Sequence, residues 1–544
     1  MEERYIASVD LGTSKMAVCV ARIMDQDVQV IYYKESPSQG IRYSYVNNPG
    51  KVEDGLRKAI SEAQQELKIK IQQVIVGLPR YHVRQETASA SMGRTEPDNQ
   101  ISDSEVRALK SMALETYPLG DSKNEVIYGA VAQSFSTEDS LNELENDIVG
   151  MTAEKLEGNF KVFIGNRRHS TNIDNVFNSM GIAIAKKYFT PGITARAVLK
   201  EEQMENGVAL IDIGAGVSSV TIFKGKIMRY YAAIPFGGNS ITNDIKTECN
   251  FSFSLAENIK KAYGACMPGK LSALGEKSIQ VVDDNEVPTA QVTVKYISEI
   301  ITARMKEIIE ALLYHIQVSG YATEDILRAG VVVTGGGSEI VNCANYIKEL
   351  SGYSVKIGYP RRFFSCEGCP EAVEASASTS MGMIMAAKGD KMLNCIKEAP
   401  ARRYWSAPKA AVPEPADGSA GSPTDYTATP SGYTSTPTDN TVPEPAEGPN
   451  IAETPEPVIE ERPVEERPIE ETVSAGMDDS TVFDEPTQAE IDSFRDKKKK
   501  EKTKTVKEPR QPRPKPQFKW FKHIQSSVEE MVGGIFDKME NEEV

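Results

Sequence analysis

Two short loops of small residues, each led by an aspartate, could do chemistry in this chain. They span Asp10–Lys15 and Asp212–Ser218. Each loop lies between two apolar runs, so each predicts a β-hairpin with an aspartate at the end of its first strand. Such a turn presents backbone N–H groups to phosphate oxygens, and a nearby aspartate can hold a magnesium ion through water. The repetition predicts two similar half-domains around one nucleotide.

A third glycine-rich segment and one charged pair are further candidates. The run Val331–Thr334 predicts a buried strand that meets Gly335–Gly337, and we expect a helix to follow through Leu350. A glycine turn there would let a ring or a phosphate approach the backbone, although an ordinary strand-to-helix turn has the same pattern. Glu257 and Lys260 are three residues apart and share one helix face, a spacing that equally fits a surface ion pair.

The composition excludes several classes of protein. A formal net charge of −16 over 544 residues argues against general nucleic-acid binding. Seven scattered cysteines indicate reduced cytoplasmic thiols, and the lone Cys366–Cys369 pair lacks the second pair of a zinc ribbon, so we expect it to be inert. The N-terminus has no signal-peptide pattern, and no apolar run approaches about 18 residues, so any membrane contact is expected to be peripheral.

The character of the chain changes near residue 400. Before it, strand and helix patterns alternate as in an α/β fold. Residues 396–496 are acidic and rich in proline, which predicts a disordered linker, and the basic segment 497–516 follows. This basic run lacks interleaved aromatic residues, so attraction to an anionic membrane suits it better than nucleic acid.

The last segment, residues 517–541, has apolar side chains at helical spacing. We expect an amphipathic helix that lies in the plane of a membrane, with its lysines toward anionic headgroups. Docking on the chain's own core or on a partner is the alternative. The expected membrane-facing residues are Phe518, Trp520, Phe521, Ile524, Val528, Met531, Val532, Ile535 and Phe536.

The three glycine loops, in this order, resemble the signature of the actin-like ATPase superfamily across roughly residues 5–390. Residues 205–239 and 52–78 are similar to the FtsA family of bacterial cell-division proteins. This resemblance implies an α/β, bilobal, actin-like (ribonuclease-H-like) ATPase fold with an inserted subdomain, followed by the disordered linker and the C-terminal amphipathic helix. The implied parts are residues 1–82 and 166–203 for the first lobe, 83–165 for the inserted subdomain and 204–395 for the second lobe.

The resemblance also implies ATP and Mg²⁺ as ligands, with Asp10 and Asp212 holding the metal through water. The implied ATP-binding residues are Asp10, Gly12, Thr13, Ser14, Lys15, Asp212, Gly214, Ala215, Gly216, Glu257, Lys260, Gly335, Gly336 and Gly337. At the second loop, Ala215, Val217 and Ser219 stand where the family commonly has glycine, threonine and aspartate. We therefore expect ATP holding with at most slow hydrolysis, and no catalytic base is assigned.

The family's role implies a location and partners. It implies self-association into filaments on the cytoplasmic face of the inner membrane at the division site, with FtsZ, anionic lipids and other division proteins as partners. Two alternatives remain open. One is a phosphotransferase of the related sugar-kinase fold, and the other is a membrane-docked platform that does not polymerise, like the pilus-assembly relative PilM.

Overall fold

We describe a computed structural model of the chain. It describes residues 3–25, 27–282, 288–323, 325–361, 364–366 and 368–397. The linker beyond residue 397, the basic segment 497–516 and the expected membrane helix 517–541, with all nine of its listed apolar residues, lie outside this part. Within the described part, no helix is long and apolar enough to cross a bilayer.

The first lobe is built on a mixed sheet that begins with the expected hairpin. Strands β1 (Arg4–Leu11) and β2 (Lys15–Met24) pair antiparallel and are joined across the Asp10 loop. β3 (Asp27–Pro37) continues the antiparallel part, whereas β6 (Gln73–Leu78) runs parallel to β1 and β10 (Ala183–Phe189) parallel to β6. The order is β10-β6-β1-β2-β3, so the carboxyl ends of β1 and β6 meet at one edge.

The second lobe repeats this order of strands. Its sheet runs β13-β12-β11-β16-β17, with β11, β12 and β13 antiparallel and β16 and β17 parallel to β11. The bounds are β11 (Val208–Ile213), β12 (Ser218–Lys224), β13 (Ile227–Ile234), β16 (Val331–Thr334) and β17 (Val355–Ile357). Both predicted hairpins are therefore confirmed, and the shared topology places the Asp10 and Asp212 loops at equivalent positions of two ribonuclease-H-like halves.

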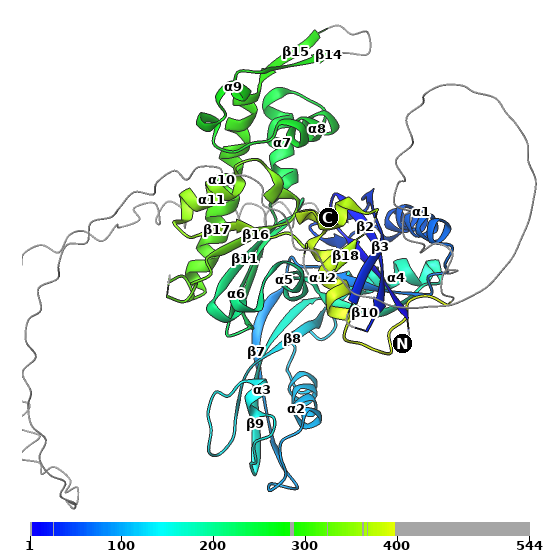
Figure 1. The fold of residues 1–544 in the computed structure, drawn as a ribbon, viewed down its shortest axis with the longest axis vertical. Coiled ribbons are helices and arrows are strands. Elements are labelled where there is room, and N and C mark those ends of the chain that lie inside the picture. The colour runs from blue at the N-terminus through cyan, green and yellow to red at the C-terminus, as the bar shows by residue number, and fades with distance from the viewer. Residues whose placement is uncertain are drawn as a thin grey trace, which may run out of the picture. The chain divides into compact units, whose positions relative to one another are not determined.

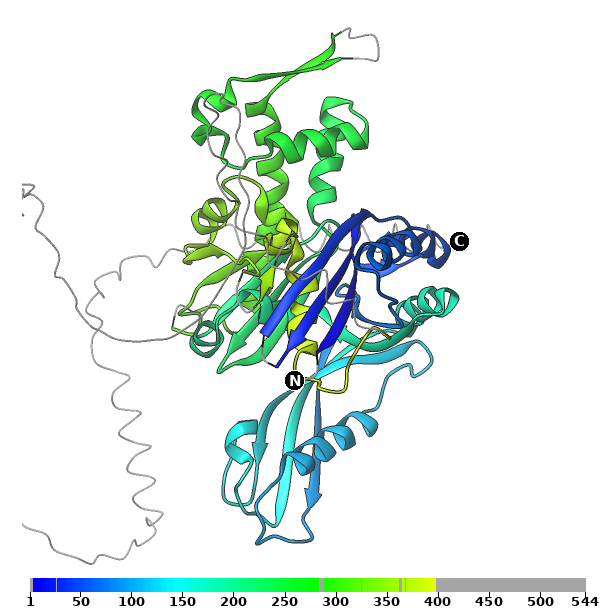
Figure 2. The same ribbon diagram turned by 45° about the vertical axis from the view of Figure 1, so that its right-hand side comes forward.

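Helices cover the first sheet and bury its apolar side chains. α1 (Pro49–Leu67) begins where the Asn48 side chain accepts the Lys51 N–H and Pro49 fixes the first turn. α1 lies beside α4 (Arg167–Met180), as Figure 2 shows in blue and blue-green. α5 (Thr190–Val198) packs on α12 (Ser378–Ala387), which contacts β1, β2 and β6.

The second sheet is covered mainly by α10 (Val294–Val318), whose apolar side chains pack against the strands. α10 and α8 (Phe253–Tyr263) both place apolar side chains in the core of this lobe. The other elements of this lobe are α6 (Glu201–Asn206), α7 (Gly238–Cys249), α9 (Ser272–Gly275), α11 (Cys343–Ser351) and the hairpin β14 (Ser278–Val282) and β15 (Pro288–Thr293). Figure 1 shows α7, α8 and α9 grouped beyond the sheet.

Residues 84–166 form a separate sheet with its own core. Its order is β7-β9-β8, fully antiparallel, from β7 (Arg84–Gly93), β8 (Glu125–Ser136) and β9 (Lys155–Asn166). α2 (Asp103–Glu115) packs on β7 and β9, and α3 (Glu145–Ile148) contacts β8. A capping box of Ser102 and Glu105 starts α2. Figure 1 shows this sheet projecting from the two lobes.

The segment after β17 corrects one predicted boundary. The sequence prediction extended the second lobe to residue 395, but β18 (Ser365–Cys366) pairs with β3, and Ile396 forms a bridge with Ile71. The apolar side chains of α12 are buried in the core of the first lobe. The chain therefore returns to its first lobe, because that core has the open face that α12 fills.

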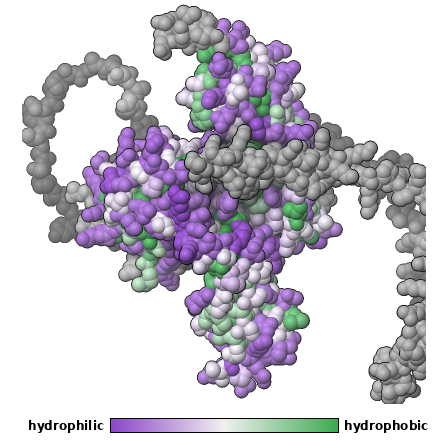
Figure 3. All heavy atoms as spheres, turned by 180° about the vertical axis from the view of Figure 1, so that it is seen from behind, coloured by the Kyte–Doolittle hydropathy of each residue, from purple (hydrophilic) through white to green (hydrophobic). Residues whose placement is uncertain are grey.

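Two short elements and the surface complete the description. β4 (Ile41–Arg42) and β5 (Tyr45–Val46) form a small hairpin between β3 and α1. The face shown in Figure 3 is mostly hydrophilic, with scattered hydrophobic spots among the coloured residues. Met392 and Leu141 are exposed large apolar side chains that lie far apart in the sequence, and single exposed apolar residues are ordinary for a protein surface.

Candidate functional site

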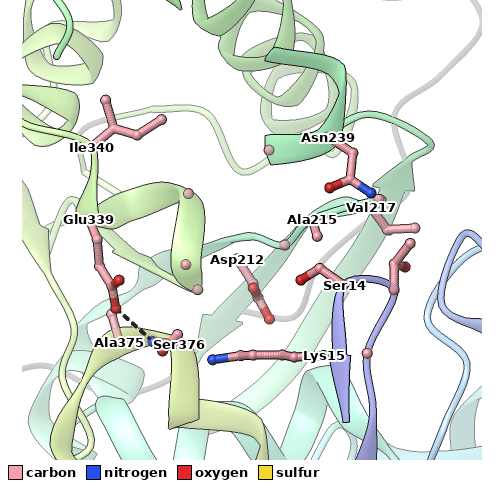
Figure 4. A pocket seen from close by; sticks show the side chains of 18 of the residues that line it. Ser14, Lys15, Asp212, Ala215, Val217, Asn239, Glu339, Ile340, Ala375 and Ser376 are labelled. Atoms are coloured by element: carbon pink, nitrogen blue, oxygen red, sulfur yellow. Dashed lines mark hydrogen bonds between the residues drawn. The ribbon is translucent and has the colours of Figure 1, made fainter. Parts of the chain in front are cut away.

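The loops predicted from the sequence meet in one cavity between the two lobes. Its volume is about 470 Å³, which lies in the usual range for small-molecule sites. All of the predicted ATP-binding residues line it, from Asp10 and its loop to the three glycines after β16. Figure 4 shows Ser14 and Lys15 on one side, with Asp212, Ala215 and Glu339 from the second lobe around the same space.

The two aspartate hairpins have matching turns. A methyl group added at Gly12 would lie 2.5 Å from the carbonyl oxygen of Lys15, and one at Gly214 would lie 2.7 Å from that of Val217. Both glycines are therefore required by the same close approach of the chain to itself. The Gly214 N–H donates to Val217 at 3.0 Å, so this amide closes the turn and is already used. The amides of Ala215 and Gly216 are the next donors in this loop that a phosphate group could use.

The two loops also touch each other across the cavity. A methyl group at Gly216 would lie 2.8 Å from the Thr13 side chain. The Thr13 hydroxyl accepts the Ser44 N–H at 3.1 Å. Tyr43 and Ser44, at the tip of the β4–β5 hairpin, both have positive φ, at 48° and 69°. This tip is thus held in a left-handed turn directly beside the first phosphate-type loop.

The two aspartates differ in their partners. Asp10 is half-buried, and burial raises the pKa of its carboxyl, although the charges of Arg80 and Lys15 oppose the rise. Asp212 forms an ion pair with the guanidinium of Arg80, which reaches it from the loop after β6. Arg80 thus joins the first lobe to the acidic residue of the second. Nothing in the sequence analysis had assigned Arg80 to the site.

Lys15 and Glu339 place opposite charges along another wall. Lys15 forms an ion pair with Glu35, whose carboxylate also accepts the Tyr33 hydroxyl at 2.7 Å. Glu339 accepts the Ser376 N–H at 3.1 Å, and burial raises the pKa of its carboxyl. In Figure 4 the ammonium of Lys15 points toward Ser376, beneath Asp212. The positive charge of Lys15 on this wall is therefore offset by the carboxylates of Glu35 and Glu339.

Glu257 and Lys260 form the expected pair on α8, with 2.6 Å between their charged atoms. The pair is turned into the cavity, where Lys260 also donates to the Thr242 hydroxyl at 2.8 Å and to the Gly238 carbonyl at 3.0 Å. Burial lowers the pKa of Lys260. For Glu257 the effect of burial is outweighed by Lys260, so its pKa is lowered. These side chains are fixed in place, unlike an exposed surface pair.

The glycines after β16 pack directly on the Asp212 strand. Gly335 has φ +83°, and a methyl group there would overlap the Asp212 carboxylate and lie 2.6 Å from the Ile213 carbonyl oxygen. The expectation of one helix through Leu350 was wrong in part. A 3₁₀ turn covers Gly336–Glu339, and α11 starts only at Cys343, because Asn342 has positive φ and interrupts the helix.

The three departures from the family pattern are accommodated by the fold. Ala215 does not have positive φ, so its methyl group causes no backbone strain. Val217 is buried, and Ser219 is buried opposite Asp212 in the β11–β12 pairing. The second loop therefore keeps its turn. It lacks a hydroxyl at 217 and a carboxylate at 219, so the changes remove functional groups without altering the backbone.

The carboxylates, backbone amides and ammonium groups that line the cavity are of the kinds that bind a magnesium nucleotide. In the part of the chain described by the structure, no three His, Cys, Asp or Glu side chains gather into a metal cage. Mg²⁺ normally uses only one or two carboxylates and completes its shell with water and phosphates, so Asp10 and Asp212 fit it. Backbone amides of the hairpin turns and the ammonium groups of Lys15 and Lys260 fit phosphates and hydroxyls.

Several lining residues escaped the sequence analysis. Arg80 follows β6, and a charged residue after an apolar strand parallel to β1 was the signal that could have found it. Gly238 and Asn239 begin α7 and donate to the carbonyls of Gly214 and Ala215 at 2.9 and 2.8 Å. Ser376 comes from the segment that returns to the first lobe, so only the three-dimensional path brings it here.

Comparison with known proteins agrees with this geometry. The family model described as "Cell division protein FtsA" matches residues 209–382. The cell-division protein FtsA of Neisseria meningitidis serogroup B is 27% identical over 390 residues, which cover 71% of this chain and 91% of that protein. These matches support assignment of the chain to the FtsA family. The FtsA of Pseudomonas aeruginosa is also 27% identical, over 70% of this chain and 89% of its own length.

Among solved structures, a PilM–PilN type IV pilus biogenesis complex covers 70% of this chain and 98% of its own, with a TM-score of 0.49 and 13% identity. The FtsA model match begins in β11, beside Asp212, and ends in α12. It therefore spans the second aspartate loop, the α8 pair and the glycines after β16. The sequence matches and the repeated strand order together support the actin-like fold.

Proposed function

We propose that this FtsA-family chain binds ATP with Mg²⁺ in the cavity between its lobes. The observation that carries the proposal is the pair of matching aspartate hairpins that face one space from two lobes. In this assignment the loops of Asp10 and Asp212 receive the phosphates and the metal. Glu257 and Lys260 receive the ribose, and Gly335–Gly337 flank the adenosine.

The nucleotide is proposed to act mainly as a structural ligand. Groups from both lobes line the cavity, so one bound molecule would bridge them and favour a closed arrangement. The absence of a hydroxyl at Val217 and of a carboxylate at Ser219 supports holding over rapid hydrolysis. We assign no catalytic base and expect at most slow ATP turnover.

The cellular role follows from the family and from the tail sequence. We propose that the chain self-assembles on the cytoplasmic face of the inner membrane at the division site. There it would anchor FtsZ filaments and recruit other division proteins. The membrane contact is assigned to residues 517–541, whose apolar face and basic flank suit an anionic surface.

Co-pelleting with vesicles tests this role. The full chain should pellet with vesicles that contain anionic phosphatidylglycerol and should bring FtsZ down with it. A chain that ends at residue 516 should leave both proteins in the supernatant while it still binds ATP. Pelleting of the shortened chain with vesicles would contradict the tail assignment, and failure of the full chain to retain FtsZ would contradict the anchoring role.

A turnover assay separates the enzyme alternative. ATP consumption should stay slow with and without a panel of sugars. Fast, sugar-dependent ADP release would instead favour the phosphotransferase. Filaments of the ATP-loaded chain on a lipid monolayer, seen by electron microscopy, would exclude a platform that does not polymerise.

A further inference from the structure

Arg80 forms an ion pair with one aspartate of the cavity, and its charge also acts on the other. The partner in the ion pair is Asp212 of the second lobe, and the other aspartate is Asp10 of the first. The side chains of Arg80 and Asp212 are only 17% and 10% exposed. The backbone carbonyl of Arg80 accepts the Tyr231 hydroxyl, so the residue is held from both ends. The side chain of Arg80 is therefore held in a defined position in the cavity wall.

The location matters because Asp212 is buried and Asp10 is half-buried, and two carboxylates in one cavity need a counter-charge. Asp10 and Asp212 sit at equivalent strand ends and would repel each other without a cation between them. In a magnesium site the metal supplies that charge. In this chain the guanidinium of Arg80 supplies that positive charge. Arg80 lies in the loop after β6, outside both aspartate hairpins.

The geometry of the second loop brings the same guanidinium to the phosphate side. A methyl group added at Gly214 would lie 3.2 Å from an Arg80 terminal nitrogen. The amides of Ala215 and Gly216 follow directly in that loop. A guanidinium presents several donors in a planar fork that matches phosphate oxygens as well as it matches a carboxylate. Arg80 can thus serve Asp212 and a phosphate group from nearly one position.

We propose that Arg80 binds the nucleotide phosphates and provides part of the positive charge that Mg²⁺ otherwise provides, so that this site binds ATP with only a modest requirement for the metal. The inference rests on the proposed ATP site and deepens it. It makes Arg80 a phosphate-binding residue that joins the two lobes and sets the metal dependence of binding.

The test is the ratio of the ATP dissociation constants measured in excess EDTA and in excess Mg²⁺, by calorimetry on the full chain. For the wild-type chain the ratio should stay within about tenfold. Arg80→Gln should weaken metal-free binding more than magnesium-supported binding and raise the ratio at least about tenfold. Arg80→Lys, which keeps the charge and loses the fork, should lie between them.

The matched control is Arg84→Gln. Arg84 is exposed on β7, pairs with Glu125 and does not line the cavity, so its loss should leave the ratio unchanged. A wild-type ratio above about tenfold would overturn the inference without any variant. So would an Arg80→Gln chain, folded by circular dichroism, whose ratio equals the wild-type ratio.

These outcomes separate the inference from the proposed function. If the wild-type chain binds ATP tightly with Mg²⁺ and hardly at all without it, the ATP site stands and the role of Arg80 falls. If the wild-type chain binds no ATP with or without the metal, the ATP site itself is wrong, and the inference falls with it.

Discussion

At the scale of single residues, the cations of the cavity are paired with carboxylates. Three of its cations have an acidic partner in the structure: Lys15 pairs with Glu35, Lys260 with Glu257 and Arg80 with Asp212. Each pair is at least partly buried, so none is an ordinary solvated ion pair. A polyphosphate would have to compete for these cations, and it can do so because charge-assisted hydrogen bonds to phosphate are strong. Binding of a polyphosphate would therefore replace the carboxylate partners of these cations with phosphate oxygens, while the cations keep their positions.

Gly335 gives a residue-scale prediction with a matched control. Gly335→Ala would place a methyl group against the Asp212 carboxylate at a φ of +83°, and it should weaken ATP binding at least about tenfold because Asp212 must move. Gly352 has a similar φ of +75° with open space around it. Gly352→Ala should cost about 1 kcal/mol of stability and leave the affinity unchanged in calorimetry. Equal affinities for the two variants would contradict the assignment.

His169 gives a prediction about pH. Its ring stacks on Tyr45 at 4.0 Å, and burial lowers its pKa from 6.5 to about 4. The unfolded chain therefore takes up this proton first as the pH falls. The stability that neutral His169 contributes is present above about pH 6.5 and is lost as the pH falls toward about 4. His169→Gln should flatten the fall of the melting temperature across this window. Identical slopes for both proteins would contradict the assignment.

At the scale of elements, local patterns predicted structure well where the chain folds on itself nearby. The two aspartate hairpins, α8, α10 and β16 follow from apolar periodicity and turn residues that lie side by side in the sequence. The return of α12 to the first lobe could not be predicted this way, because a continuous apolar helix does not indicate which core it joins. Arg80 was missed for the same reason, since its partner Asp212 is 132 residues away.

The capping box of α2 gives an element-scale prediction. The Ser102 hydroxyl accepts the Glu105 N–H, and the Glu105 carboxylate accepts the Ser102 N–H at 2.8 Å. Ser102→Ala should lower the free energy of unfolding by about 1 kcal/mol, measured by denaturant titration. Arg107→Ala, on the exposed side of the same helix, should change it by less than about 0.5 kcal/mol. An equal effect of both changes would mean that the cap does not stabilise α2.

At the scale of the molecule, two halves of one topology carry equivalent loops, and the site lies between them. The last strand pairing and α12 tie the end of the described chain back to the first lobe, so the second lobe is an insertion between two parts of the first. The groups that line the cavity therefore come from segments at both ends of the fold. The affinity for a ligand that contacts all of these groups therefore depends on the arrangement of both lobes.

The most direct test of the account is calorimetric titration of the full chain with ATP in the presence of Mg²⁺. The account predicts one binding site per chain, and it predicts that Lys260→Ala weakens binding at least about tenfold because the ribose wall loses its fixed cation. Absence of binding heat from a folded wild-type chain, confirmed by a second method such as displacement of a fluorescent ATP analogue, would contradict the account.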